Sequence, residues 1–566
     1  MKTDTRLLLL ALTLVLSSCG SKQEHARADL VIRNADVRTQ DAATPTATAI
    51  AVTGDKIVYV GDEQGVAEWI GPATVSVDAA GNTVLPGLID SHIHAAEAAL
   101  SLGGCTLNDK QLKVEETADT IRACVAADKT STWIVVNAVN PAGFKANRHD
   151  LDKIEKDRAL FLWGSDGHTG WLNTRGLELA GITRDTPNPG VGRIERDAKG
   201  DATGFLADAT GLALSKMDKA TPAQRLDALR KVLPLLHATG ITSYLEANTD
   251  EPTVDAYAEL AKLHELTARV TVAFETSDEA TPAEFTRLEA QRAKLTDPLF
   301  RGDFIKLFAD GVLEYPTQTA ALLTPYNDAK GKPGKSSGQI FIPRADMDAF
   351  IAEAGKRGFN IHVHAIGDGA VRETLDAFAA ARAAGSKQLF SIAHLQLIEP
   401  SDIPRFAKLN VFPSLQLLWA QPDNYSIDAL TPWLGDERMA RQYPARSLVD
   451  AGAVVAGGSD WDVSSYNPFE AMATAMSRKN PEQPERAPLV PSEAMTLDEM
   501  LAAYTINAAK LMGRDSQFGS LSVGKFADLI VLDRKLTAQT SADDVRVTRP
   551  TRVFFNGRDV TPKPAN

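Results

Sequence analysis

The central part of this 566-residue chain alternates short apolar runs with amphipathic segments, and this alternation limits the fold more than any other feature. The apolar runs have the length and composition of buried strands, and the segments between most of them, such as residues 347–358 and 370–385, have helical periodicity. The candidate strands are residues 88–94, 241–247, 270–276, 304–310, 360–366, 390–396, 411–417 and 453–460. Eight βα units in succession predict an α/β fold, a TIM-type (β/α)8 barrel within residues 87–510.

Residues 29–86 and 511–566 do not follow this rhythm, because both contain short strands bounded by turns. The run "TGDKIVYVG" indicates a hairpin around Gly54 and Asp55, and further strands are expected at 524–533 and 550–560. We therefore expect a small composite β-sandwich domain formed from both chain ends. Residues 98–235 are too long for one crossover, and we interpret them as an insertion after the first barrel strand, with strands of its own at 133–136 and 159–163.

The first residues form a targeting segment rather than part of the fold. A basic start precedes the apolar run 7–16, which is too short to span a bilayer as a stable helix. The following "LSSC" resembles the lipobox of bacterial lipoproteins, in which the cysteine, here Cys19, is lipidated and becomes the new N-terminus. This resemblance implies a signal peptide at 1–19, a tether at 20–28 and a lipid-anchored protein of the cell envelope that faces the periplasm, with Ser21 favouring the outer membrane. A plain secretory signal is the alternative.

Two cysteines remain beyond this segment, Cys105 and Cys124. In an oxidising compartment such an even pair predicts a disulfide, and two buried thiols are the alternative. The formal net charge of −13 argues against a nucleic-acid partner, because the composition offers no basic excess to contact phosphates. Whether the chain forms a homodimer stays open.

Metal-binding residue types fall at the ends of the predicted barrel strands. His92 and His94 are separated by one residue, so an extended strand places both imidazoles on one face, which is half of a common transition-metal site. The other candidates lie on the fourth, fifth, sixth and eighth strands: Lys306, His364, His394 and Asp460. The active site of a barrel is built at the C-terminal ends of its strands, so these six side chains are expected to converge. The pattern therefore predicts a metal-dependent site.

Several motifs resemble the amidohydrolase superfamily, in particular its YtcJ-like branch, which contains N-substituted formamide deformylase. They are "GLIDSHIH", "KLFADG", "HAIGDGAV", "AHLQ", "GGSDW" and "GSLSVGKFADLIVLD", and the likeness covers nearly all of residues 29–560. The resemblance implies two divalent metal ions per chain, with zinc favoured. One would be bound by His92, His94 and Asp460, the other by His364 and His394, and a carboxylated Lys306 would bridge them. His362, which shares a face with His364, is expected to support the site rather than to bind metal.

The insertion contains a further likeness to this branch, "FLWGSDGHTGWLNTRGLELAGIT". In this segment His168 and Asp166 are candidate substrate-binding residues that would reach over the barrel mouth. Trp461, which follows the last metal-ligand candidate, is a third candidate and would form a wall of the pocket. A structural turn histidine and plain packing of the tryptophan are the alternatives.

The implied chemistry is hydrolysis by a metal-activated hydroxide, with Asp460 moving the proton to the leaving amine and Lys306 as the second catalytic residue. We expect a small-molecule amide as substrate, so that a C–N bond of an amide, N-formyl or N-acyl group is cleaved. An esterase or lactonase would use the same site, and a deaminase would not need Lys306. A non-catalytic binding or regulatory lipoprotein would be expected to lose ligands. Ala393 and Asp462 depart from the pattern of the branch, so the resemblance does not identify the substrate.

Overall fold

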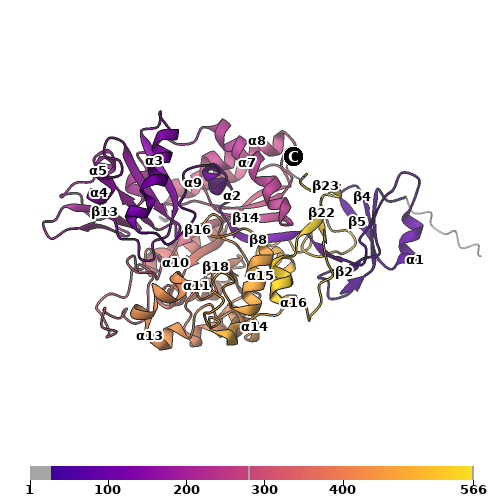
Figure 1. Ribbon diagram of the computed structural model, residues 1–566. Helices are drawn as coiled ribbons and strands as arrows, with labels where there is room; N and C mark the ends of the chain where they lie inside the picture. Colours follow the sequence, from indigo (N-terminus) through magenta and orange to yellow (C-terminus); the bar gives the residue numbers. More distant parts are fainter. Residues whose placement is uncertain (1–26, 278–280, 564–566) are drawn as a thin grey trace, which may run out of the picture.

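The computed structural model describes residues 27–277 and 281–563. Figure 1 shows three parts, with the insertion at one end of the molecule, the barrel in the middle and the small β domain at the other end. The predicted signal peptide, including Cys19, lies outside the described residues. Across the described part of the chain, no helix is both long and apolar enough to cross a bilayer.

The barrel is an eight-stranded sheet in which each paired strand runs parallel to its neighbours. In sheet order its strands are β8 (Leu88–Ile93), β14 (Ile241–Thr249), β15 (Arg269–Phe274), β16 (Phe300–Phe308), β17 (Asn360–Ala365), β18 (Phe390–His394), β19 (Val411–Leu415) and β20 (Ala456–Gly457). Sheet order equals sequence order, which is the arrangement that successive βα units produce. The predicted (β/α)8 barrel is therefore confirmed.

The eighth strand is shorter than predicted, and the residues after it close the barrel. Only two residues of the predicted strand 453–460 pair with β19. The backbone N–H of Asp460 then donates to the carbonyl of His92, and the N–H of His94 donates to the carbonyl of Trp461, both at 2.8 Å. Asp460 has a φ of 54°, a left-handed conformation that takes it out of the extended strand. This turn brings its carboxylate beside both histidines of β8.

Helices pack around the barrel between its strands. They are α7 (Pro222–Ala238), α8 (Glu251–Lys262), α9 (Pro282–Ala293), α10 (Arg344–Lys356), α11 (Asp368–Ala383), α12 (Ile403–Leu409), α13 (Thr431–Met439), α14 (Ala445–Asp450), α15 (Pro468–Ser477), α16 (Leu497–Ala503) and α17 (Ile506–Leu511). The helices expected at 347–358 and 370–385 are α10 and α11. Local sequence fixes where such helices begin: in α7, Pro222 occupies the first turn and the hydroxyl of Thr221 accepts from the N–H of Gln224. Apolar side chains of these helices and of the strands form the largest hydrophobic core.

The small β domain is a sandwich of two sheets that combines both chain ends, as predicted. One sheet contains β5 (Lys56–Gly61), β4 (Ala49–Thr53), β1 (Leu30–Arg33) and β6 (Val75–Asp78). The other contains β23 (Arg558–Asp559), β22 (Pro550–Phe555), β21 (Leu529–Leu532), β7 (Thr83–Pro86), β2 (Asp36–Arg38) and β3 (Thr46–Ala47). β7 and β21 join the two chain ends by antiparallel pairing, and β4 and β5 form the expected hairpin. Side chains from both sheets, such as Ile32, Val52 and Leu529, share one buried core.

The insertion has its own five-stranded sheet. In sheet order its strands are β12 (Arg193–Arg196), β13 (Ala202–Ala207), β11 (Thr169–Leu172), β10 (Ala159–Gly164) and β9 (Trp133–Val139). The two strands predicted here, 133–136 and 159–163, lie within β9 and β10. The structure also joins Cys105 to Cys124, which lies in α3 (Ala118–Ala127), in a disulfide with the two Cα atoms 5.8 Å apart.

Removing this disulfide is expected to destabilise the insertion. The bond links residues 19 positions apart, and closing a loop of that size stabilises the folded state by about 3 kcal/mol, because it restricts the unfolded chain. The double variant Cys105→Ser/Cys124→Ser should lower the free energy of unfolding by that amount in a urea titration of the non-reduced protein. Two free thiols in the native protein, found by mass analysis under non-reducing conditions, would contradict the assignment.

Candidate metal centre

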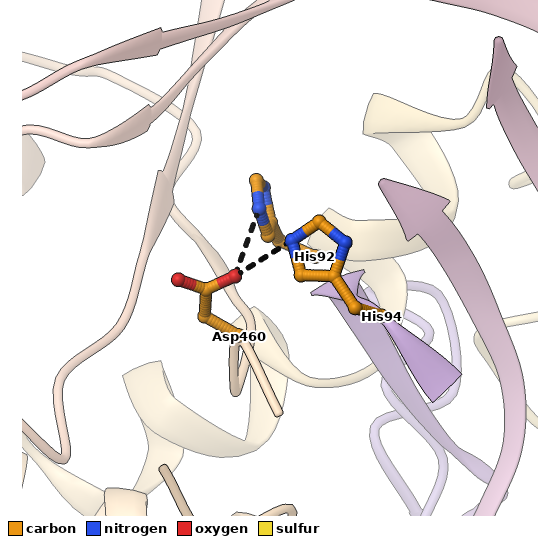
Figure 2. Close-up of side chains that lie close together, drawn as sticks. All are labelled: His92, His94 and Asp460. Carbon is orange, nitrogen blue, oxygen red and sulfur yellow. Dashed lines mark ion pairs between the residues drawn. The ribbon is translucent and has the colours of Figure 1, made fainter. Parts of the chain in front are cut away.

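His92, on β8, and His94, just after β8, meet Asp460 at the C-terminal end of the barrel. Nε2 of His92 lies 3.2 Å from Oδ1 of Asp460, and Nε2 of His94 lies 3.0 Å from the same oxygen. Figure 2 shows both rings turned toward this one carboxylate oxygen. His92 is fully buried, and His94 stands at the first turn of α2 (Ala95–Ser101) with 18% of its side chain exposed. The three donor atoms therefore converge on one point that remains reachable from the barrel mouth.

The arrangement of these atoms fits a divalent cation. Oδ1 of Asp460 is buried and has no hydrogen-bond partner among the described residues, although both Nε2 atoms lie close to it. A buried polar atom without a partner costs about 1–3 kcal/mol, and a cation held between the three donors would remove that cost. A set of two imidazoles and one carboxylate is typical of zinc sites.

The ring of His92 is held in place from behind by His362. Nδ1 of His92 lies 2.6 Å from Nε2 of His362, and Nδ1 of His362 lies 2.6 Å from the hydroxyl of Ser391. When each ring donates its Nδ1–H along this chain, Nε2 of His92 keeps its lone pair for a metal. A fixed tautomer of this kind is what supporting hydrogen bonds give to metal-binding histidines. His362 is thus placed behind the site, where the sequence analysis expected it.

Lys306 and the two remaining histidines complete the cluster. Lys306, on β16, is 1% exposed, and its Nζ lies 3.4 Å from Nε2 of His92. The rings of His364 and His394 lie 4.4 Å apart between centroids, and Nδ1 of His394 lies 3.9 Å from Oδ2 of Asp460. All six side chains that the sequence analysis singled out as metal ligands therefore lie together at one end of the barrel.

Burial sets the charge of these groups. It lowers the pKa of His92 to about 3, helped by the charge of Lys306, and it lowers the pKa values of His364 and His394 well below the usual histidine value. These imidazoles are therefore neutral at pH 7, which is the form that binds metals. Burial also lowers the pKa of Lys306 to about 7, so a large fraction of its amine is uncharged near neutral pH.

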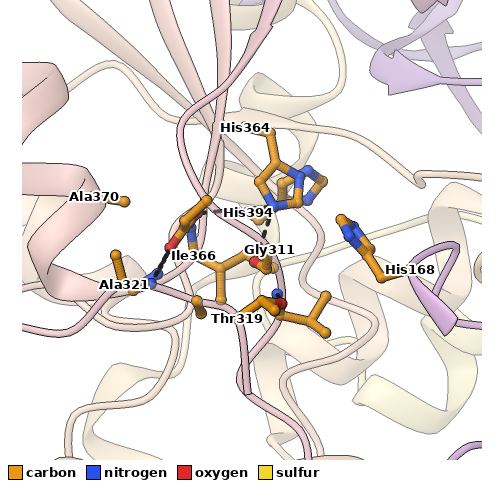
Figure 3. Close-up of polar contacts among 12 residues, drawn as sticks. His168, Gly311, Thr319, Ala321, His364, Ile366, Ala370 and His394 are labelled. Carbon is orange, nitrogen blue, oxygen red and sulfur yellow. Dashed lines mark hydrogen bonds and ion pairs between the residues drawn. The ribbon is translucent and has the colours of Figure 1, made fainter. Parts of the chain in front are cut away.

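Asp310 organises the loops around His364. Its carboxylate accepts from the backbone N–H groups of Ala321, Ile366 and Gly367 at 2.8–3.0 Å, which ties the loop after β16 to the loop after β17. Figure 3 shows two of the donor residues, Ala321 and Ile366, together with Gly311 and His364. Nε2 of His364 lies 3.1 Å from the carbonyl of Gly311 in the same loop. The predicted strand 304–310 ends at Asp310, and no local pattern indicates these backbone partners.

The three candidate substrate-binding residues lie in different settings. His168 reaches from the insertion to the barrel mouth, where its ring lies 5.2 Å from that of His364. Oδ1 of Asp166 accepts from the N–H groups of His168 and Thr169, so it shapes the turn that carries His168. Trp461 packs against Tyr466, with ring centroids 4.5 Å apart.

Sequence reasoning missed one aromatic contact to the centre. The ring of Trp419 stacks on His394, with centroids 5.5 Å apart and planes 8° apart. It lies in the loop after β19, and no local pattern distinguishes it from an ordinary core tryptophan.

Comparisons with known proteins agree with this fold and centre. A family model described as the amidohydrolase family matches residues 76–561. N-substituted formamide deformylase from Arthrobacter pascens is 28% identical over 550 residues, which cover 94% of this chain and 97% of that protein. An uncharacterized metal-dependent hydrolase from Pyrococcus horikoshii has a TM-score of 0.70 at 21% identity, over 91% of this chain and 99% of that one. The zinc complex of atrazine chlorohydrolase TrzN from Arthrobacter aurescens has a TM-score of 0.50 at 17% identity, over 94% and 95%.

The fold and the donor cluster define a barrel hydrolase with a metal centre. Because the family model covers most of the chain, the protein belongs to the amidohydrolase family, as its motifs indicated. It is a metal-dependent enzyme that acts on carbon–nitrogen bonds other than peptide bonds.

Proposed function

We propose that the protein hydrolyses the amide bond of a small N-formyl or N-acyl amine. The observation that carries this proposal is the convergence of His92, His94 and Asp460 on one point, with Lys306 and two further imidazoles beside it. The similarity to N-substituted formamide deformylase, which extends over nearly the whole length of that protein, supports an amide as the substrate.

Different residues would bind the metals and transfer the proton in such a reaction. His92, His94 and Asp460 would hold one divalent cation, His364 and His394 a second, and Lys306 would bridge them as a carbamate. When bound, two such cations supply Lewis-acid chemistry that polarises a carbonyl and acidifies water. Asp460 accepts the proton of the attacking water and passes it to the nitrogen of the leaving amine. Surrounding imidazoles hold the pKa of Asp460 well below its usual value although burial raises it, so the carboxylate starts in the form that can accept a proton.

A metal assay combined with a substrate screen tests this function. The soluble form without residues 1–19 would be analysed for bound metal and offered amides, esters and amino-heterocycles. We expect two zinc ions per chain, cleavage of N-formyl or N-acyl amines, and loss of that activity on chelation with recovery on adding zinc. Cleavage of esters or deamination without any amide hydrolysis would contradict the proposal.

We also propose that the mature protein is a lipoprotein of the cell envelope that faces the periplasm and is anchored through Cys19. The basis is the basic start, the apolar run and the "LSSC" sequence, which lie outside the described residues. Cys19→Ser should move the protein from the membrane fraction to the soluble fraction, or leave its signal uncleaved, because no acyl chain can be attached. Membrane partition equal to that of the wild type would show that the lipobox interpretation is wrong.

A further inference from the structure

His168 belongs to the insertion but lies at the metal centre. It is carried by the turn between β10 and β11, and its ring lies 5.2 Å from the ring of His364, with 15% of the side chain exposed. Figure 3 shows its imidazole turned away from the insertion toward His364. The insertion therefore adds one nitrogen-bearing side chain to a centre whose other members come from the barrel.

Asp208 fixes the direction of this ring. Its Oδ1 lies 2.5 Å from Nδ1 of His168, and its backbone N–H donates to the carbonyl of His168 at 2.8 Å. The other ring nitrogen, Nε2, has no hydrogen-bond partner in the described part of the chain. An imidazole held through one nitrogen, with the second one free beside a metal ligand, is placed to contact a bound molecule.

The loop after β16 leaves room for the His168–Asp208 pair at Gly311. A Cβ atom placed on Gly311 would lie 2.2 Å from Oγ1 of Thr319 and 2.6 Å from Oδ2 of Asp208, so the glycine leaves room for both side chains. The polar groups that face His364 from that loop, the carbonyl of Gly311 and the carboxylate of Asp310, only accept hydrogen bonds. His168, on the side of His364 that faces the insertion, can donate a hydrogen bond.

We propose that His168 is a catalytic residue that donates a hydrogen bond from Nε2 to the carbonyl oxygen of the substrate, and that Asp208 is its positioning residue. This inference rests on the proposed amide hydrolysis and adds a source of oxyanion stabilisation to it. The buried ion pair between Nδ1 of His168 and Oδ1 of Asp208 holds one hydrogen of the ring, and in the proposed role Nε2 carries the other.

No proton is transferred from His168 in the proposed amide hydrolysis. Water adds to the carbonyl carbon while its proton goes to Asp460, and the π electrons of the C=O bond move to the oxygen. That oxygen becomes negatively charged, and its hydrogen bond to Nε2–H strengthens. When the C–N bond breaks, the C=O bond forms again, and the nitrogen takes its proton from Asp460. The products are a carboxylic acid and an amine.

Variants of both residues test the pair. In the zinc-loaded protein, His168→Ala should lower kcat for the best amide of the screen by about 10²–10³-fold, the loss typical of one oxyanion donor, with KM changed much less. His168→Gln keeps an N–H donor and should recover part of kcat. His149→Ala, at an exposed histidine of the same insertion, is the control and should match the wild type. Metal content should be unchanged in all three variants.

Two further measurements separate a hydrogen bond to an oxyanion from a structural role. Inorganic phosphate, a tetrahedral oxyanion, should bind the zinc-loaded His168→Ala protein at least about tenfold more weakly in calorimetry, because one charge-assisted hydrogen bond is lost. Asp208→Asn should lower kcat in the wild-type background and have no further effect in the His168→Ala background, because the two residues act as one unit.

The outcomes distinguish this inference from the proposed function. Unchanged phosphate affinity, a loss of metal that parallels the loss of kcat, or a full effect of Asp208→Asn in the absence of His168 would each overturn the role of His168. Weaker phosphate binding in a protein that cleaves no amide would support His168 as an oxyanion ligand while refuting amide hydrolysis.

Discussion

Replacement of Lys306 by alanine is expected to remove one of the two proposed metal ions and to lower kcat/KM by about 10³-fold. The side chain is buried at the end of β16, and its Nζ lies 3.4 Å from Nε2 of His92. The proposed carbamate at this position would supply two oxygens to the two halves of the donor cluster. Loss of one cation removes several kcal/mol of transition-state stabilisation, and about 4 kcal/mol corresponds to that factor.

The surroundings of Lys306 support the proposed carbamate. Its Nζ lies 3.4 Å from Nε2 of His92 and 4.7 Å from the ring centre of Phe308, and no carboxylate of the described residues is within ion-pair distance, so a permanent positive charge here would be unfavourable. Because burial lowers its pKa to about 7, much of the amine is uncharged near neutral pH and can add to carbon dioxide. Starting from the neutral amine, that reaction forms an N–C bond and releases one proton, and it changes the charge of the side chain from 0 to −1.

Metal analysis and turnover of four proteins test this prediction. Lys306→Ala should regain part of its activity when a short carboxylic acid such as propionate is added, because the acid can occupy the vacated space. Lys306→Glu should keep more metal than the alanine variant, since it restores an anion. Lys231→Ala, at an exposed lysine, should behave as the wild type. Two metals per chain with near-normal turnover in Lys306→Ala would refute the bridging role.

Much of the fold could be predicted because strands and helices are encoded locally. The predicted strand 411–417 overlaps β19 (Val411–Leu415), and the predicted helix 370–385 overlaps α11 (Asp368–Ala383). The eighth strand was predicted too long, because the apolar run suggests extension as far as Asp460. In the structure β20 stops pairing with β19 after Gly457, and Asp460 hydrogen-bonds to His92 of β8 instead. The length of β20 depends on where the barrel closes, and this is determined by the whole sheet rather than by the local sequence.

The ligand positions were also predictable, since strand ends converge in any barrel of this type. The hydrogen-bond partners of the residues that support them were not. His92 and His362 are separated by 270 positions, and their hydrogen bond depends on the alignment of β8 with β17 across the barrel. The pairing of His168 with Asp208 likewise depends on how β11 and β13 align within the insertion. Local patterns reveal such residue types but not their partners.

A buried ion pair between Arg269 and Asp528 lies at the junction between the barrel and the sandwich. Arg269 begins β15 at the end of the barrel remote from the metal centre and is 1% exposed. Its Nε lies 2.6 Å from Oδ2 of Asp528, its second nitrogen 3.2 Å from Oδ1, and it also donates to Asn556. The guanidinium carbon lies 3.6 Å from the ring centre of Phe526. Within the described residues, the hydrogen-bond and ring partners of this side chain come from the C-terminal segment, so it adds a polar link to the apolar contacts between the two domains.

Arg269→Ala is therefore expected to lower the free energy of unfolding by about 3–5 kcal/mol, because it leaves the carboxylate of Asp528 buried without its partner. A guanidinium chloride titration would measure the change, and Arg230→Ala, which removes an exposed arginine from a surface ion pair, should leave the midpoint nearly unchanged. Adding Asp528→Asn to the Arg269→Met variant should recover part of the loss, since no unpaired charge is then buried. Metal content of the folded protein should stay constant throughout, because the pair lies away from the donor cluster. An Arg269→Ala protein as stable as the Arg230→Ala protein would show that the two domains are held together by their apolar contacts alone.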